Sequence, residues 1–193
     1  MTLEGSVQLE LDDARAGAAY EGVRGEERHR ISELKRTRRV RLGETLALVF
    51  ENRDTIRSTL EEALRTERID DPERVAAERA AFNAVVPVQG ELAAVLFLEV
   101  DDPADLGAAA ADIEGVEQNV FLEVAGARVR GVAEAVAPPG ESAPAHYLRF
   151  VLDDRERAAV LSGSPIAIGA DHPNLTVLVQ LDDEQRQSLA ADL

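Results

Sequence analysis

Residues 92–98 read Leu-Ala-Ala-Val-Leu-Phe-Leu, without one polar side chain. The run has the length of a strand, and a strand that is apolar at every position is expected to be buried on both faces. It is too short to cross a membrane, because a membrane helix needs roughly 20 apolar residues. We therefore expect residues 92–98 to form a central strand, around which the other elements are arranged.

Segments on both sides of this strand predict β-hairpins, because short alternating or apolar runs are separated by turn residues. The paired segments are 39–42 with 46–50, 120–124 with 128–132, and 166–170 with 175–181. Residues 145–152 form a further predicted strand, in which His146, Leu148 and Phe150 share one face. These strands predict a mixed, largely antiparallel sheet.

Helices are predicted between the strands, most of them from an aspartate that can cap the helix N-terminus. The predicted helices cover 26–38, 55–67, 72–86, 103–115, a short segment after Asp153 and the segment after Asp182. Asp54 is the expected cap of the helix over 55–67, and Ala137 to Ser142 is expected to be a loop. The sequence thus predicts an α+β fold with about five to six helices packed on the sheet. Residues 1–25 are expected to be a loosely docked arm, and residues 26–193 a single compact domain.

Composition excludes several classes of function. The chain has no cysteine, which excludes disulfides, thiolate catalysis, iron–sulfur ligation by this chain and cysteine zinc sites. Residues 1–11 carry no basic segment, so they do not predict a signal peptide. With no membrane span predicted, we expect a cytoplasmic protein.

The net charge of −16 is unevenly distributed. Residues 24–41 hold eight basic side chains and only three acidic ones. This stretch could bind an anion or nucleic acid, but it lacks interleaved aromatic residues on which bases could stack. On so acidic a chain, pairing with its own acidic helices or with an acidic partner is favoured over nucleic acid.

Polar residues 51–54 (Glu-Asn-Arg-Asp) interrupt the chain between an apolar strand and a helix. They allow two interpretations. One is turn chemistry, in which Asp54 caps the helix and its neighbours are solvated. The other is a functional site mounted at a strand end.

Two histidines lie at ends of the C-terminal strands, His146 at one and His172 in the Asp171-His172-Pro173 turn at another. If these ends meet the 51–54 segment, they would form one hollow with carboxylate, guanidinium and imidazole groups. Glu51, Arg53 and His146 are then the candidate catalytic residues, and Asn52, Asp54, Glu91 and Arg149 the candidate binding residues. His146, His172 and Asp171 are candidate ligands of a nitrogen/oxygen metal site, although no helical metal-ligand motif is present. The sequence identifies no cofactor.

Several short motifs together resemble a bacterial family known as domain of unknown function 3501. They are Phe50-Glu51-Asn52-Arg53-Asp54-Thr55-Ile56, Leu64-Arg65-Thr66-Glu67-Arg68-Ile69, Phe82-Asn83, Gly90-Glu91-Leu92, His146-Tyr147-Leu148-Arg149-Phe150 and Asp171-His172-Pro173. The resemblance extends over about residues 26–193.

The resemblance implies an accessory or binding protein that works with an iron–sulfur oxidoreductase and a rubrerythrin in redox or oxidative-stress metabolism. The residues leave two alternatives open. One is a small, metal-dependent enzyme with a site at Glu51, Arg53, His146 and His172, and the other is anion or nucleic-acid binding by residues 24–41.

Overall fold

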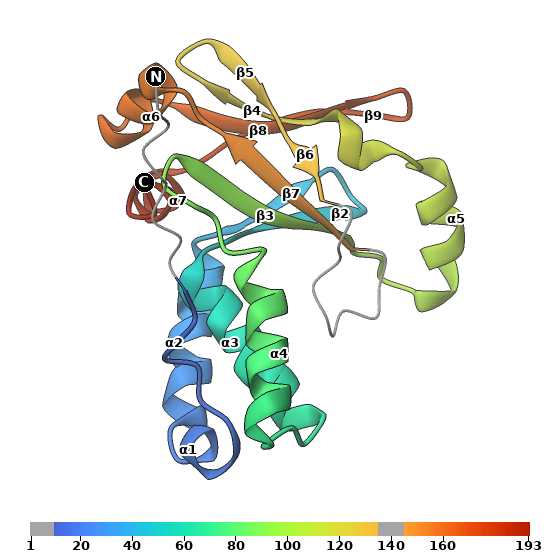
Figure 1. Ribbon diagram of the computed structural model, residues 1–193. Coiled ribbons are helices and arrows are strands. Elements are labelled where there is room, and N and C mark those ends of the chain that lie inside the picture. The colour runs from blue at the N-terminus through green and yellow to red at the C-terminus, as the bar shows by residue number, and fades with distance from the viewer. Residues whose placement is uncertain (1–9, 135–144) are drawn as a thin grey trace.

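The computed structural model describes residues 10–134 and 145–193. Three layers are visible in Figure 1: a group of helices, a five-stranded sheet and a four-stranded sheet. The five-stranded sheet has the order β1 (Arg39–Leu42), β2 (Leu46–Glu51), β3 (Glu91–Leu98), β7 (Ala145–Val151) and β6 (Val132–Ala133). The four-stranded sheet has the order β5 (Ala127–Arg130), β4 (Val120–Val124), β8 (Ile166–His172) and β9 (Leu175–Gln180).

The predicted central strand is confirmed. β3 lies between β2 and β7 in antiparallel register. Alternate side chains of β3 enter two different cores, since Leu92, Ala94 and Leu96 pack against the second sheet while Ala93 and Val95 pack against the helices. An apolar residue is needed at each position because both faces of the strand are covered.

Helices lie before the first strand, after the last strand and in several connections between strands. They are α1 (Gly17–Glu21), α2 (Arg24–Arg36), α3 (Arg53–Thr66), α4 (Pro72–Asn83), η1 (Pro103–Asp105), α5 (Leu106–Asp112), η2 (Val116–Asn119), α6 (Asp154–Leu161) and α7 (Asp183–Ala190). The predicted buried residues Ile56, Leu60 and Leu64 of α3 all lie in the core between the helices and the first sheet.

The predicted helix caps are confirmed at Asp71, Asp153 and Asp182. The prediction for α3 was wrong, because Asn52 rather than Asp54 caps this helix. The Asn52 side chain accepts a hydrogen bond from the Thr55 N–H at 3.1 Å, and Thr55 Oγ1 accepts one from the Asn52 N–H at 2.8 Å. Asp54 is left in the first turn, where it pairs with Arg30 at 2.8 Å.

The α+β class is confirmed, but the strands form two sheets whose pairs are all antiparallel, where one sheet was expected. The change of sheet occurs at Gly131, between β5 and β6. The Gly131 N–H donates to the Val120 carbonyl at 2.9 Å. A Cβ atom at this position would lie 2.9 Å from Cε1 of Phe150, so the crossing depends on glycine. The predicted 128–132 strand is therefore divided between the two sheets.

Residues 10–25 are packed more firmly than the expected loose arm. Leu11 and Tyr20 are fully buried. The Leu11 N–H donates to Asn83 Oδ1 at 2.8 Å, and the Tyr20 hydroxyl donates to Glu62 at 2.9 Å. The loop expected at 137–142 lies outside the described residues. In the described parts of the chain, every helix is too short or too polar to span a bilayer.

Candidate functional site

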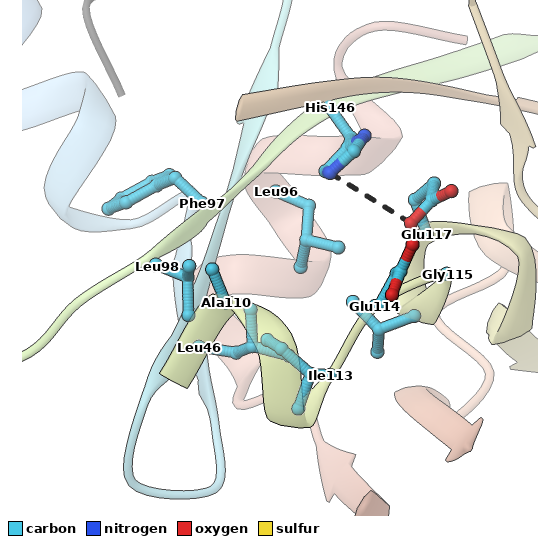
Figure 2. A pocket seen from close by; sticks show the side chains of 11 residues that line it. Leu46, Leu96, Phe97, Leu98, Ala110, Ile113, Glu114, Gly115, Glu117 and His146 are labelled. Carbon is cyan, nitrogen blue, oxygen red and sulfur yellow. Dashed lines mark ion pairs between the residues drawn. The ribbon is translucent and has the colours of Figure 1, made fainter. Parts of the chain in front are cut away.

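A pocket of about 220 Å³ opens where β2 begins and β3 ends. α5 and the segment that follows it cover the pocket (Figure 2). Its lining is largely apolar and consists of Leu46, Leu96, Phe97, Leu98, Ala110, Ile113, Glu114, Gly115, Val116, Glu117 and His146. The titratable side chains among these are two glutamates and one histidine.

Strand register brings the histidine to the pocket. His146 is the second residue of β7 and pairs with Leu96 of β3, so both side chains lie on the face toward the second sheet. The imidazole points toward the Glu117 carboxylate in Figure 2. The sequence predicted that His146 faces inward with Leu148, but its position at the strand end leaves 41% of the side chain exposed.

A turn after α5 brings the carboxylate to the same place. Gly115 has φ +82°, in the left-handed region that favours glycine, and it immediately precedes η2. Val116, the first residue of η2, is buried and anchors the segment against the core. Glu117 follows at the rim of the pocket.

The His146 and Glu117 side chains lie close to each other but do not form a hydrogen bond. Nε2 of His146 lies 3.8 Å from Oε2 of Glu117, which is within ion-pair range but too long for a hydrogen bond. The Glu117 side chain is only 15% exposed, and its other oxygen accepts a long hydrogen bond of 3.4 Å from Gln118. A carboxylate that is largely removed from water thus has one weakly engaged neighbour that can carry positive charge.

Glu51 does not join this pocket, because it lies on the opposite face of the first sheet from His146. Oε1 of Glu51 accepts a hydrogen bond from Lys35 at 3.1 Å, and its buried Oε2 lacks a hydrogen-bond partner among the described residues. Glu51 lines a second cavity of about 20 Å³ with Tyr147, whose hydroxyl donates to the Val85 carbonyl. Burial raises the pKa of Tyr147 above its ordinary value.

Arg53 faces the N-terminal segment. It donates to the Glu10 carbonyl at 2.7 Å and to Asp13 at 2.5 Å. Burial opposes ionisation of Asp13, but hydrogen bonds from Arg53 and Arg57 outweigh it and lower the pKa of this carboxyl to about 2. The Arg53 side chain therefore binds the N-terminal segment to the start of α3.

Asn52 and Arg149 also make internal contacts. Besides capping α3, Asn52 donates to Asp192 at 2.9 Å. Burial raises the pKa of Asp192, even though the buried Arg38 lies against it. Arg149 donates to Glu91 at 2.6 Å and to Glu134 at 2.9 Å, which places the candidate binding residues Glu91 and Arg149 in one ion-pair group away from the pocket.

The turn between β8 and β9, which includes His172, contacts the main chain of Glu114, a residue of the pocket lining. His172 Nε2 lies 3.1 Å from the Glu114 carbonyl, and Nδ1 accepts from the Asn174 N–H at 3.2 Å. Asp171 lies 3.6 Å from Arg128. Over residues 10–134 and 145–193, no group of three or more histidine, aspartate or glutamate side chains is arranged to hold a metal ion, so His146, His172 and Asp171 do not form the expected cluster.

The expectation that the 51–54 segment and the two late strand ends share one hollow was therefore wrong. Side chains alternate between the two faces of a sheet, and the strand register places Glu51 and His146 on opposite faces. Arg53, at the start of α3, contacts the N-terminal segment instead of the pocket. Sequence analysis missed Glu117 and the apolar pocket. Nothing in residues 113–117 marked them, because their role depends on how this segment packs against β3 and β7.

The basic stretch 24–41 pairs within the chain, as the intramolecular alternative predicted. Seven of its eight basic side chains lie within ion-pair distance of a carboxylate, namely Arg24, Arg28, Arg30, Lys35, Arg36, Arg38 and Arg39. Arg41 donates to the Glu44 carbonyl at 3.0 Å. Three of these residues, Arg24, Arg28 and Arg30, link α2 to α3.

Comparisons with known proteins agree over nearly the whole chain. A crystal structure of a novel protein of unknown function from Burkholderia pseudomallei K96243 superimposes with a TM-score of 0.87 at 34% sequence identity. The match covers 97% of this chain and 100% of that one. No curated protein matches the sequence. The model of the family described as protein of unknown function (DUF3501) matches residues 8–193, and the chain therefore belongs to this family.

Proposed function

We propose that the chain is a cytoplasmic accessory protein that binds a small molecule in the pocket beside His146 and Glu117. The observation that carries the proposal is the combination of a concave apolar lining with one pair of titratable groups at its rim. Ligand sites typically have this construction, in which apolar walls supply affinity and a few polar groups fix orientation.

The placement of the other candidate residues supports binding rather than catalysis. A reaction by general acid–base chemistry needs several groups within reach of one substrate. Arg53 and Glu91 are engaged in ion pairs elsewhere, and Glu51 lies across the sheet. The pocket retains one imidazole and two carboxylates, enough to orient a ligand.

The volume limits what the pocket can hold. About 220 Å³ is below the roughly 300–1,000 Å³ of pockets for drug-sized ligands. The ligand is therefore a compact molecule, such as one with a single ring or a short branched chain.

A pair of variants in α5 tests the site. Ala110 lines the pocket, and Ala110→Phe should fill it and abolish ligand-induced chemical-shift changes at residues 96, 116 and 146. Ala111→Phe adds the same side chain to the exposed side of this helix and should leave binding unchanged. If both variants bind a small-molecule library as the wild-type chain does, the pocket is not the binding site.

The partner is a separate part of the proposal. The family resemblance implies work with an iron–sulfur oxidoreductase and a rubrerythrin, and we extend this expectation to the present chain. Affinity purification of the tagged chain from its native host should recover an iron–sulfur oxidoreductase at a level above an Ala110→Phe control that cannot load ligand. Recovery of neither redox protein would remove the partner and leave the pocket proposal to its own test.

A further inference from the structure

We infer that the pocket selects an organic cation, namely a primary amine on a compact apolar body whose ammonium group contacts Glu117. The inference rests on the proposed function and names the chemical class of the ligand. It follows from the charge at the rim, the apolar floor and the length of the His146–Glu117 contact.

The charge at the rim favours a cation. The titratable groups that line the pocket are the Glu114 and Glu117 carboxylates and the His146 imidazole. The pocket lining therefore has two acidic side chains and one basic side chain. An anionic ligand would be repelled, whereas an ammonium ion would supply a positive charge.

Glu117 is the carboxylate best placed to receive the ammonium. Glu117 is partly buried, with 15% of its side chain exposed. Its Oε1 accepts a hydrogen bond of 3.4 Å from Gln118, whereas Oε2 lies 3.8 Å from the His146 imidazole, which is too far for a hydrogen bond. An ammonium group has three N–H donors and could satisfy Oε2 directly.

The remainder of the pocket suits the apolar body of such an amine. Leu46, Leu96, Leu98, Ile113 and Val116 supply a continuous aliphatic surface. Burying the body of the ligand there gains free energy in proportion to the apolar area removed from water. The net charge of −16 also concentrates cations around the whole molecule.

The test compares three ligands of one shape, benzylamine, benzyl alcohol and benzoate, by titration calorimetry and by chemical shifts of the pocket residues. At pH 7.5 and low salt, benzylamine should bind about tenfold more tightly than benzyl alcohol, the effect of one charge-assisted hydrogen bond, and benzoate should bind weakest.

Two charge variants locate the effect. Glu117→Gln should remove the preference for benzylamine and keep the affinity for benzyl alcohol, whose retention shows that the pocket is still folded. Glu33→Gln removes the same charge from an exposed position on α2 and should change neither affinity.

The outcomes separate the two proposals. If benzyl alcohol or benzoate binds in the pocket at least as tightly as benzylamine, the inference of an amine ligand is overturned and the proposed binding function stands. If none of the three ligands shifts the pocket residues, and the library with its Ala110→Phe control also finds no ligand there, the proposed function fails together with the inference.

Discussion

Two carboxylates on opposite sides of the five-stranded sheet, Glu61 and Glu117, differ in how the protein engages them. On the helix side, Glu61 is fully buried, yet it accepts hydrogen bonds from the Arg15 main chain at 2.9 Å and from the Arg15 guanidinium at 2.8 Å and 3.1 Å. On the side that faces the second sheet, Glu117 is partly buried, with a hydrogen bond of 3.4 Å from Gln118 and an imidazole 3.8 Å away. Both oxygens of Glu61 accept hydrogen bonds from Arg15, whereas Oε2 of Glu117 is left available to a new partner.

Because of this difference, Glu61 has a structural role, whereas Glu117 is available to bind a ligand. On the helix side, Arg15, Arg30 and Arg57 are among the residues that donate hydrogen bonds to carboxylates, and they join the N-terminal segment, α2 and α3. Removing one partner from such a group leaves a buried charge behind. The pocket side instead has a mainly apolar surface that can accept a new partner without loss of an existing one.

Breaking the satisfied site should have the largest effect. Arg15→Met leaves the Glu61 carboxylate buried with only a main-chain donor, and should reduce the free energy of unfolding by about 3–5 kcal/mol. Urea denaturation measures this change. Arg28→Met is the matched control, because Arg28 is 60% exposed and lies 3.9 Å from Glu62, so its loss should cost less than about 1 kcal/mol. Equal costs for the two variants would contradict the comparison.

An apolar substitution between the sheets should come next. Leu148 is fully buried in that core, and Leu148→Ala should cost about 3–4 kcal/mol, because it removes buried carbon atoms and leaves a cavity. This cost should not depend on pH between 3 and 7, since no charge is changed. Val151→Ala on the same strand removes a side chain that is 60% exposed and should cost under about 0.5 kcal/mol. A marked pH dependence in the Leu148→Ala loss would show that the two faces are coupled.

Acid should weaken the helix side in particular. Hydrogen bonds from Arg30 and then Arg57 lower the pKa of Glu27 from 4.5 to about 2, against the effect of burial. The folded protein therefore binds this proton less readily than the unfolded chain, and the stability that Glu27 contributes is complete above pH 4.5 and lost as the pH falls through about 2. The shift corresponds to at most about 3 kcal/mol, and solvent screening reduces this contribution because Glu27 is only partly buried.

Urea midpoints measured from pH 6 to pH 2 test this expectation. Glu27→Gln should be less stable than the wild-type chain at pH 6, and the two should converge at pH 2. Parallel curves would mean that Glu27 does not carry the acid sensitivity. Asp13, whose pKa is also lowered to about 2, should contribute a smaller share because half of its side chain is exposed.

The sequence determined most of the elements, because these depend on local chemistry, but it did not predict α1 or η2. The apolar run 92–98 defined a strand covered on both faces, and aspartates followed by proline or by a capping partner defined the starts of α4, α6 and α7. The error at α3 was also local, since Asn52 and Asp54 are both good caps and the reciprocal bond with Thr55 selects Asn52.

Only the tertiary structure decided which elements meet. Strand parity fixed that Glu51 and His146 share a sheet but not a face, and Gly131 divided a predicted strand between two sheets. The pocket exists because residues 113–117 pack beside the end of β3 together with Leu46 of β2 and His146 of β7, which lie far from them in sequence. Such contacts depend on sheet order and on the packing of layers, which a short stretch of sequence does not predict. Glu117 can therefore be identified as a candidate ligand-binding residue only in the folded chain.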